Sequence, residues 1–298
     1  MFIIKYKKIF LSISLVLVLI SIGSLLVYKL PLGIDFKGGA LTEITYTENR
    51  PDVEIINQAL ANNEIIGGAI VQPEGDKNLI IRTKDLGETQ RQELVSKLNT
   101  TGAFTLNNYT SIGPSVGREL TNKMILAIII VSLIIILFIA YAFRGVSKPV
   151  KSWKYGVIAV ITLLHDIIIP VGIFAVISRI YHAEVDTLFV VALLTVIGLS
   201  ISDTIVIFDR IRENLKNKRY NTFPETVGQS LNQVYTRSIN TALTVIIVLV
   251  ALSIFGPSTT KVFALMMTAG MICGTYSSIF LASPMLVLAQ ELQDRKKA

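Results

Sequence analysis

Charged residues are scarce in this chain of 298 residues. Only 16% are Asp, Glu, Lys or Arg, whereas 52% are hydrophobic. Soluble domains carry about 25% charged residues, so this is not the composition of an ordinary soluble protein. The hydrophobic residues form long, continuous runs, and about 20 apolar residues in a helix span the hydrocarbon of a bilayer. Continuous rather than alternating runs indicate membrane-spanning helices and not barrel strands.

Cysteine is also nearly absent. The single Cys273 excludes an internal disulfide, and its place within an apolar run predicts a small apolar filler. The segment from Lys29 to Lys123 contains no Cys or His and no phosphate-binding loop. This argues against catalysis there and favours a binding or mechanical role. We expect no catalytic residue, no metal site and no cofactor.

Six apolar runs are long enough to span a membrane. They are Ile9–Tyr28, Met124–Phe143, Tyr155–Ile177, Thr187–Phe208, Ser238–Phe255 and Val262–Leu288. The first run follows three lysines, as in a signal peptide. However, it is too long for a signal core, and no small-x-small cleavage site precedes Pro31. We therefore predict that it is retained as the first span.

The basic residues indicate the orientation. They gather in short segments on one side of the six predicted spans, whereas the short segments on the other side carry only Arg179 and Lys261. This positive-inside bias predicts cytoplasmic termini and an external segment at about residues 30–122. The net charge of +7 therefore reflects topology and not nucleic-acid binding. Within the basic loop Asp209–Thr236, the spacing of apolar residues in Pro224–Tyr235 predicts a helix at the membrane surface.

The external segment has the pattern of a small α+β domain. Strands are predicted at Leu41–Thr47, Ala69–Gln72, Leu79–Thr83 and Phe104–Tyr109, with a turn at Pro73–Asp76 and helices at Asp52–Asn62 and Glu88–Leu98. The order strand, helix, strand, strand, helix, strand is the ferredoxin-like arrangement. We predict a first span in 1–30, this external domain in 31–122, and a five-helix membrane domain in 123–298.

Two Gly-rich linkers flank the predicted domain. The first is Leu32–Gly39 and the second is Ser111–Gly117. Glycine permits backbone angles that other residues avoid. The composition is equally compatible with a hinge and with a tight turn.

Ionisable residues within spans are candidates for function because placing a charge at the centre of a membrane helix costs about 2.5–3.5 kcal/mol. Asp203 lies near the cytoplasmic end of the fourth span, with Ser200 one turn before it. The fifth span begins with Arg237, and Asn240, Thr241 and Thr244 continue a polar stripe that must face protein or water. We expect Arg237 either to pair with Asp203 or to reach toward lipid headgroups.

His165 and Asp166 lie near the middle of the third span. Adjacent helix residues point about 100° apart, so we expect them to face different neighbours. The sequence does not decide whether His165 and Asp166 act in a relay or form structural hydrogen bonds. Two small-xxx-small pairs, Gly198/Ser202 and Gly270/Gly274, predict close helix packing.

Several of these segments resemble the SecD/SecF family of protein-export membrane proteins. They are Gly33-Ile-Asp-Phe-Lys-Gly-Gly39 after the first span, Ser111–Gly117, Leu164-His-Asp166, Ser202–Asn214 in the fourth span, and Arg237–Thr244 opening the fifth. The resemblance covers the whole chain in order. One departure is Ser202, where the family usually has Asn.

The resemblance implies a six-span half of the resistance-nodulation-division transporter type. It implies a SecD-like partner, association with the SecYEG channel and in many cases YajC, and contact with translocating preprotein and membrane lipid. The proton gradient, or sodium in some members, would drive late steps of export. The implied ion-pathway residues are Asp203 and Arg237, and we add the neighbouring polar candidates Ser200, Asn240, Thr241, Asp166 and His165. The implied signature and hinge residues are Gly33, Asp35, Phe36, Gly38, Gly39, Gly113, Pro114 and Gly117.

Two other functions fit parts of the sequence. A small-molecule or lipid exporter of the same superfamily would normally need two six-span halves and larger external domains. An intramembrane aspartyl protease would use Asp166 and Asp203 as a carboxylate pair. Neither Asp, however, has the flanking residues of presenilin-like proteases. Cleavage of a membrane peptide would distinguish the protease from the other functions.

Overall fold

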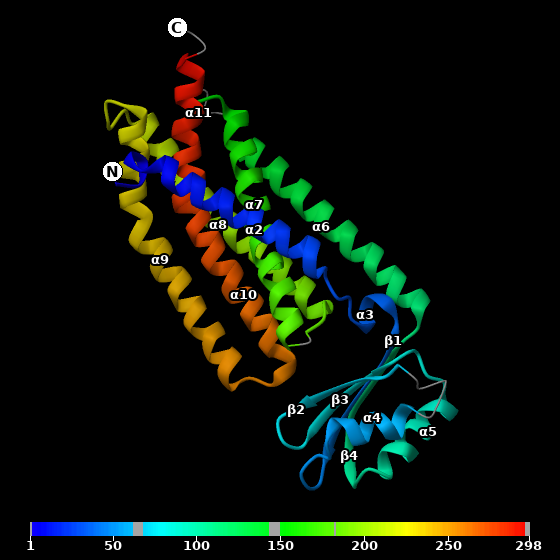
Figure 1. The fold of residues 1–298 in the computed structure, drawn as a ribbon. Coiled ribbons are helices and arrows are strands. Elements are labelled where there is room, and N and C mark those ends of the chain that lie inside the picture. Colours follow the sequence, from blue (N-terminus) through cyan, green and yellow to red (C-terminus); the bar gives the residue numbers. More distant parts are fainter. Residues whose placement is uncertain (1, 62–67, 143–149, 182, 296–298) are drawn as a thin grey trace. The chain divides into compact units, whose positions relative to one another are not determined.

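The computed structural model describes residues 2–61, 68–142, 150–181 and 183–295, which form two compact units (Figure 1). We call the unit of residues 31–126 and Glu184–Asp186 the external unit, after its predicted side of the membrane, and the unit of the other described residues the membrane unit. Six helices are long and apolar enough to span a membrane, and a four-stranded sheet forms the centre of the external unit. The predicted fold class, six spans and a small α+β domain, is confirmed.

The spans occupy long helices. They are α2 (Lys7–Tyr28), α6 (Pro114–Ala142), α7 (Ser152–Tyr181), α8 (Thr187–Lys216), α9 (Phe223–Phe255), and a sixth built from α10 (Ser258–Ser277), a π-helical turn η1 (Ser278–Ala282) and α11 (Ser283–Arg295). A short α1 (Phe2–Lys5) precedes α2. Each predicted span falls within one of these helices, except that Phe143 lies outside the described residues. The sixth helix differs from the expectation because a π-helical turn interrupts it.

The membrane unit has a buried core of three helices. In the apolar stretches of α7, α8 and the sixth helix, 56%, 50% and 72% of residues are buried, against 11%, 6% and 17% for α2, α6 and α9. A Cβ atom on Gly270 would lie 2.2 Å from Val196 Cγ2, and one on Gly274 would lie 2.9 Å from Ser200 Cβ. The backbones of α10 and α8 therefore approach at a separation that only glycine allows, as the small-xxx-small pair predicts.

The predicted surface helix at Pro224–Tyr235 is wrong as a separate element. These residues form the first turns of α9, which starts after the N-cap Thr222 and continues without interruption to Phe255. Val227 and Leu231 are buried in the bundle, and Ser230 accepts a 2.8 Å hydrogen bond from Asn214 of α8. The apolar face that predicted a membrane-surface helix is covered by protein.

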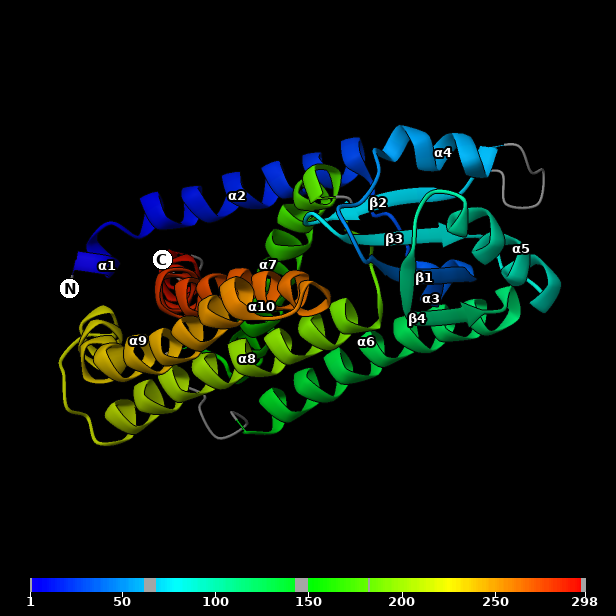
Figure 2. The same cartoon turned by 90° about the horizontal axis from the view of Figure 1, so that it is seen from below.

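The external unit is a ferredoxin-like sheet. Strands β1 (Gly39–Tyr46), β2 (Ile70–Glu74), β3 (Asn78–Thr83) and β4 (Phe104–Ile112) pair antiparallel in the order β2-β3-β1-β4. Helices α4 (Val53–Ala61) and α5 (Glu88–Asn99) contribute to one core against the sheet (Figure 2). That core consists of Ile44, Tyr46, Ile56, Leu60, Leu79, Ile81, Leu86, Leu94 and Leu98. The alternating burial of β1 and β3 explains why period-two patterning found these strands.

Three local predictions need correction. Pro73, predicted in a turn, lies inside β2, an edge strand where a missing N–H is tolerated. The predicted linker Leu32–Gly39 contains a helical turn, α3 (Ile34–Lys37), and Gly39 already belongs to β1. The linker Ser111–Gly117 is shorter than predicted, because β4 ends at Ile112 and α6 begins at Pro114, whose fixed φ suits a first helical turn.

Candidate functional site

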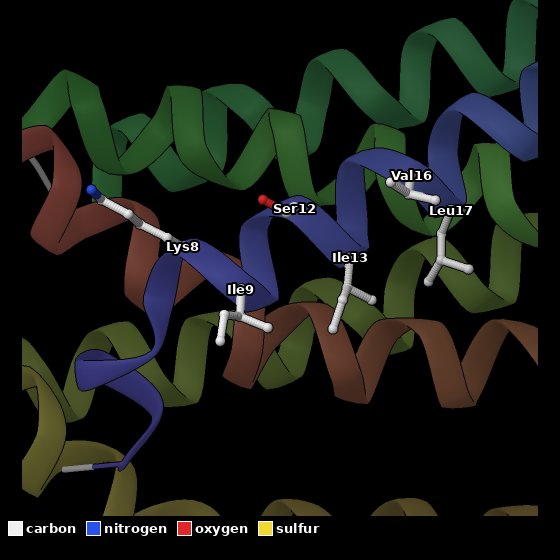
Figure 3. Close-up of a pocket in the computed structure, with 6 residues that line it drawn as sticks. All are labelled: Lys8, Ile9, Ser12, Ile13, Val16 and Leu17. Atoms are coloured by element: carbon white, nitrogen blue, oxygen red, sulfur yellow. The ribbon is translucent and has the colours of Figure 1, made fainter.

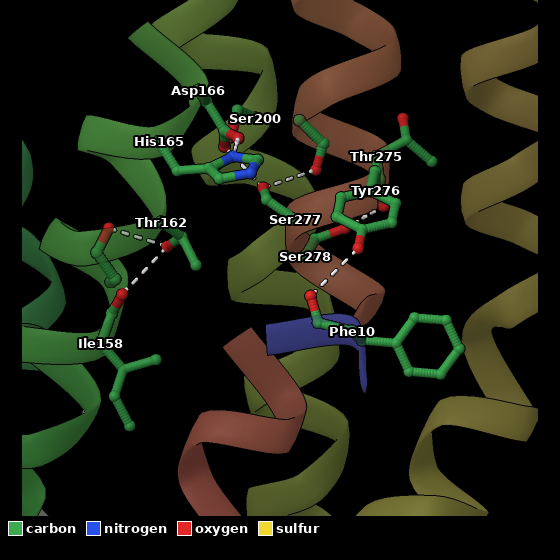
Figure 4. Close-up of polar contacts among 12 residues, drawn as sticks. Phe10, Ile158, Thr162, His165, Asp166, Ser200, Thr275, Tyr276, Ser277 and Ser278 are labelled. Atoms are coloured by element: carbon green, nitrogen blue, oxygen red, sulfur yellow. Dashed lines mark hydrogen bonds and ion pairs between the residues drawn. The ribbon is translucent and has the colours of Figure 1, made fainter. Parts of the chain in front are cut away.

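Asp166 is the centre of a polar cluster inside the membrane unit (Figure 4). Its side chain is fully buried on α7, and its Oδ2 accepts hydrogen bonds from Ser200 Oγ of α8 and, at 2.6 Å, from Ser277 Oγ at the end of α10. Its Oδ1 lies 2.8 Å from His165 Nδ1. One carboxylate therefore joins three helices.

This cluster corrects two expectations. His165 and Asp166 contact each other and are both buried, which was not expected of adjacent helix residues, although their other neighbours differ. Ser200 was expected beside Asp203, but its hydroxyl instead bonds to Asp166. The close approach of α10 at Gly274 brings Ser200 and Ser277 to the same oxygen.

No sequence pattern points directly to Ser277. It lies three residues after Gly274 and immediately before η1, and π-helical turns are frequent at functional positions. His165 Nε2 has no hydrogen-bond partner, and the ring stacks on Tyr276 with 6.2 Å between ring centroids. The sixth span thus contributes two contacts to the cluster that a search for charged residues overlooks.

Asp203 has a different environment. It is half-buried on α8, and among the described residues its side chain forms no hydrogen bond and no ion pair. Arg237 of α9 is exposed and close enough to act on Asp203 electrostatically, but the two do not form an ion pair. Instead of the expected ion pair, Asp203 and Arg237 interact through electrostatic attraction without direct contact.

The polar stripe of α9 points away from this chain. Arg237, Asn240, Thr241 and Thr244 are all exposed, although Thr244 Oγ1 donates a 2.8 Å hydrogen bond to the Thr241 carbonyl. On α8, Gly198 and Ser202 are also exposed. We call the exposed residues Gly198, Ser202, Arg237, Asn240, Thr241 and Thr244, together with the half-buried Asp203, the polar face.

The polar face is distinct from the grooves on the surface of the helices. One groove of about 450 Å³ runs along α2 and is lined by Lys8, Ile9, Ser12, Ile13, Val16 and Leu17 (Figure 3). Its lining is mostly apolar and includes no residue of the Asp166 cluster or of the polar face. It has the character of a lipid-facing surface.

The signature residues near the external unit meet in one junction. Phe36 is buried, and Thr121 Oγ1 of α6 donates a 3.3 Å hydrogen bond to its carbonyl. Cβ atoms on Gly38 and Gly117 would lie 2.8 Å from Pro114 Cα and Gly38 N, respectively. Gly33, Asp35, Phe36, Gly38 and Gly39 thus share this region with Gly113, Pro114 and Gly117. The glycines permit close backbone packing here, while a hinge stays a prediction.

Known proteins match both the sequence and this geometry. The family model "Protein export membrane protein SecD/SecF, C-terminal" matches residues 92–292, and the "SecD/SecF GG Motif" matches residues 23–49. A protein translocase subunit SecF of Thermobaculum terrenum is 41% identical over 96% of this chain and 92% of its own length. One from Anaerolinea thermophila is 36% identical over 95% and 92%.

A solved structure shows the same fold. The crystal structure of SecDF, a translocon-associated membrane protein from Thermus thermophilus, superposes with a TM-score of 0.84 at 28% identity. The match covers 97% of this chain but 38% of that one, so this chain corresponds to part of the longer SecDF polypeptide. With two family models and close relatives over nearly its whole length, this chain belongs to the SecD/SecF family of protein-export membrane proteins.

Proposed function

We propose that this chain is the SecF-type subunit of a protein translocase and pairs with a SecD-like subunit through its polar face. The observation that carries the proposal is the exposure of Arg237, Asn240 and Thr241 on a membrane-spanning helix. Polar groups exposed to hydrocarbon are costly, so such a stripe must be covered by protein or water. A partner half supplies that cover.

The relatives support this partner. In the matched SecDF structure, a region like this chain forms 38% of one longer polypeptide. Transporters with two six-helix halves pair them about an axis along the membrane normal. Of the glycines predicted to allow close helix packing, Gly198 is exposed and open to a partner, whereas Gly270 packs on Val196 of its own chain. Gly270 is therefore excluded as a partner contact.

The proton or sodium gradient acts, in this proposal, at Asp203. A group that exchanges an ion must be reachable, and Asp203 is partly exposed and not ion-paired, with Arg237 nearby. Asp166 is fully buried and contacts three polar side chains, so we infer that it holds helices together. We assign the ion route to Asp203, Arg237 and the α9 stripe, and the anchor between helices to His165, Asp166, Ser200 and Ser277.

The remaining partners follow from the family: the SecYEG channel, in many cases YajC, and the translocating preprotein. The alternatives fit less well. Asp166 is engaged by two serines and a histidine rather than by a second carboxylate, which disfavours a protease pair. The described external unit is one small four-stranded domain, which suits an export subunit better than a small-molecule exporter.

Cross-linking tests the partner. In a Cys273→Ser background, Thr241→Cys should form a covalent adduct with the SecD-like subunit when native membranes are treated with a bifunctional thiol-to-amine reagent. Leu15→Cys on α2 is the control, because Leu15 is 60% exposed and outside the polar face. We expect at least about a tenfold difference in adduct, since residues more than one helix diameter from an interface are out of reach. Equal adduct at both positions, or none at Thr241, would reject the polar face as the interface.

Reporter fusions test the orientation. Fusions at Asn217, between α8 and α9, and at Ala298 should report the cytoplasm, and a fusion at Gly75, between β2 and β3, should report the exterior. The physical reason is the basic bias of the short connections. A fusion at Gly75 that is active only in the cytoplasm would reverse the proposed topology.

A further inference from the structure

The connection between α7 and α8 folds as part of the external unit. Glu184–Asp186 group with residues 31–126 and not with the two helices that they join. The N–H of Gly33 donates a 2.8 Å hydrogen bond to the Val185 carbonyl, and the N–H of Val185 donates one of 2.8 Å to the Pro31 carbonyl. Val185 of the loop between α7 and α8 thus pairs with the chain as it enters the domain.

Gly33 is required for this pairing. A Cβ atom at Gly33 would lie 2.9 Å from the Val185 carbonyl oxygen and 3.5 Å from Glu184 Cβ. Contacts shorter than about 3 Å do not occur for real Cβ atoms, so any side chain here would push the loop away. The backbone hydrogen bonds of Val185 and the lack of a side chain at Gly33 are two independent observations that this contact is a specific feature of the fold.

An ion pair adds a side-chain contact. Arg82 Nε of β3 lies 3.0 Å from Glu184 Oε2, and the two side chains are only 14% and 22% exposed. The N–H does not point along this line, so the contact is an ion pair without a hydrogen bond. Arg82 also donates a 2.6 Å hydrogen bond to Gln72. We call Pro31, Gly33, Arg82, Glu184 and Val185 the clasp.

The charges around Glu184 show what the ion pair does. Burial raises the pKa of Glu184, whereas Arg82 and Lys37 lower it and Asp186 raises it further, and burial prevails. The ionised pair is therefore not a net source of stability, as is common for buried pairs. The effect of the ion pair is to fix the position of Glu184 relative to β3. Glu184→Gln keeps the size of the side chain and leaves Arg82 bound to Gln72, so the domain should still fold.

We propose that Glu184 and Arg82 are positioning residues that couple the external domain to α7 and α8 during gradient-driven export. This proposal rests on the proposed function. Asp203 and Ser200 lie on α8, which starts at Thr187 directly after the clasp residues Glu184 and Val185, and Asp166 lies on α7. With the clasp closed, a displacement at the start of α8 is carried to Gly33 and β3. When the clasp contacts are broken, the loop changes its own conformation, and the displacement of α8 does not reach the external domain.

The test compares Glu184→Gln with Glu88→Gln, which removes the 2.6 Å ion pair between Glu88 and Arg91 on the exposed surface of α5. Preprotein import into inverted vesicles is measured with ATP present and the gradient on or collapsed. Glu184→Gln should lower the gradient-stimulated part of import at least about fivefold, because fivefold is the lower end of typical coupling between two sites. The ATP-driven part and the amount of partner-bound chain should not change. Glu88→Gln should behave as wild type.

A disulfide provides the rescue. Leu32 and Val185 are paired across a parallel bridge, which places their Cα atoms about 4.8 Å apart, within disulfide range. Leu32→Cys with Val185→Cys, added to Glu184→Gln in a Cys273→Ser background, should restore the gradient response when oxidised and lose it on reduction. A merely destabilised domain would not show this reversal.

Two results would overturn the proposal. One is a full gradient response from Glu184→Gln. The other is an oxidised double-cysteine variant that stays impaired while its disulfide is formed. If Glu184→Gln is normal while Asp203→Asn is inactive, the clasp is rejected and the proposed function stands. If wild-type vesicles show no gradient response, both are rejected.

Discussion

Replacing Asp203 with asparagine is expected to abolish the gradient-stimulated part of preprotein export while leaving assembly with the SecD-like subunit intact. Asparagine has the same shape but can neither lose nor gain a proton. Asp203 forms no hydrogen bond or ion pair in the part of the chain that the structure describes, so the substitution breaks neither kind of interaction there. Import into inverted vesicles, with ATP present and the gradient on or collapsed, measures the loss.

The expected size of the effect follows from the driving force. Moving one charge across 100 mV is worth about 2.3 kcal/mol. That energy is about a fiftyfold bias between two states, since each 1.4 kcal/mol is a factor of ten. A variant that cannot change its charge loses this bias entirely, so its import with and without the gradient should be equal.

Arg237 supplies matched variants. Arg237→Met removes the charge that attracts Asp203 and should lose nearly all of the stimulation, whereas Arg237→Lys keeps the charge and should retain part of it. Because Arg237 is exposed in this chain, neither change disturbs its core. Asp203→Asn vesicles that respond to the gradient as wild type does would show that Asp203 is not on the ion route.

Much of the fold could be predicted from local patterns. The six spans are visible as apolar runs because lipid requires them to be long and uninterrupted. The strands β1 and β3 alternate because one face packs on α4 and α5, as burial of Ile44 and Leu79 shows. The prediction failed where one pattern has two possible causes. The apolar face at Val227 indicates burial, which either lipid or protein can provide, and here the bundle covers it.

The site was predictable only in part. Charged residues in spans are easy to find, so Asp166, Asp203 and Arg237 were candidates. Their partners depend on how three helices pack, and nothing local to Ser200 indicates Asp166 rather than Asp203. Ser277 and Glu184 were missed for the same reason, because a serine in a membrane helix and an acid in a loop are each unremarkable until the fold brings them to a partner.

Replacing Asp166 is expected to affect folding more than gradient response. Asp166→Ala leaves His165, Ser200 and Ser277 without their shared acceptor, and breaking a buried pair from one side costs about 3–5 kcal/mol. We expect this variant to fail to accumulate. Asp166→Asn keeps one acceptor oxygen and the side-chain volume, so it should accumulate with a lowered melting temperature. Thermal unfolding of the complex in mild detergent measures both.

Thr162→Val is the matched control on the same helix. Thr162 is also buried, but its hydroxyl bonds only to the carbonyls of Ile158 and Ala159 in its own helix (Figure 4). Its loss should cost less than about 1 kcal/mol, because no second helix depends on it. Per folded molecule, Asp166→Asn should keep its gradient response, since the sealed carboxylate joins α7, α8 and α10 and does not exchange with water. An Asp166→Asn protein with wild-type melting but no response would place Asp166 on the ion route beside Asp203.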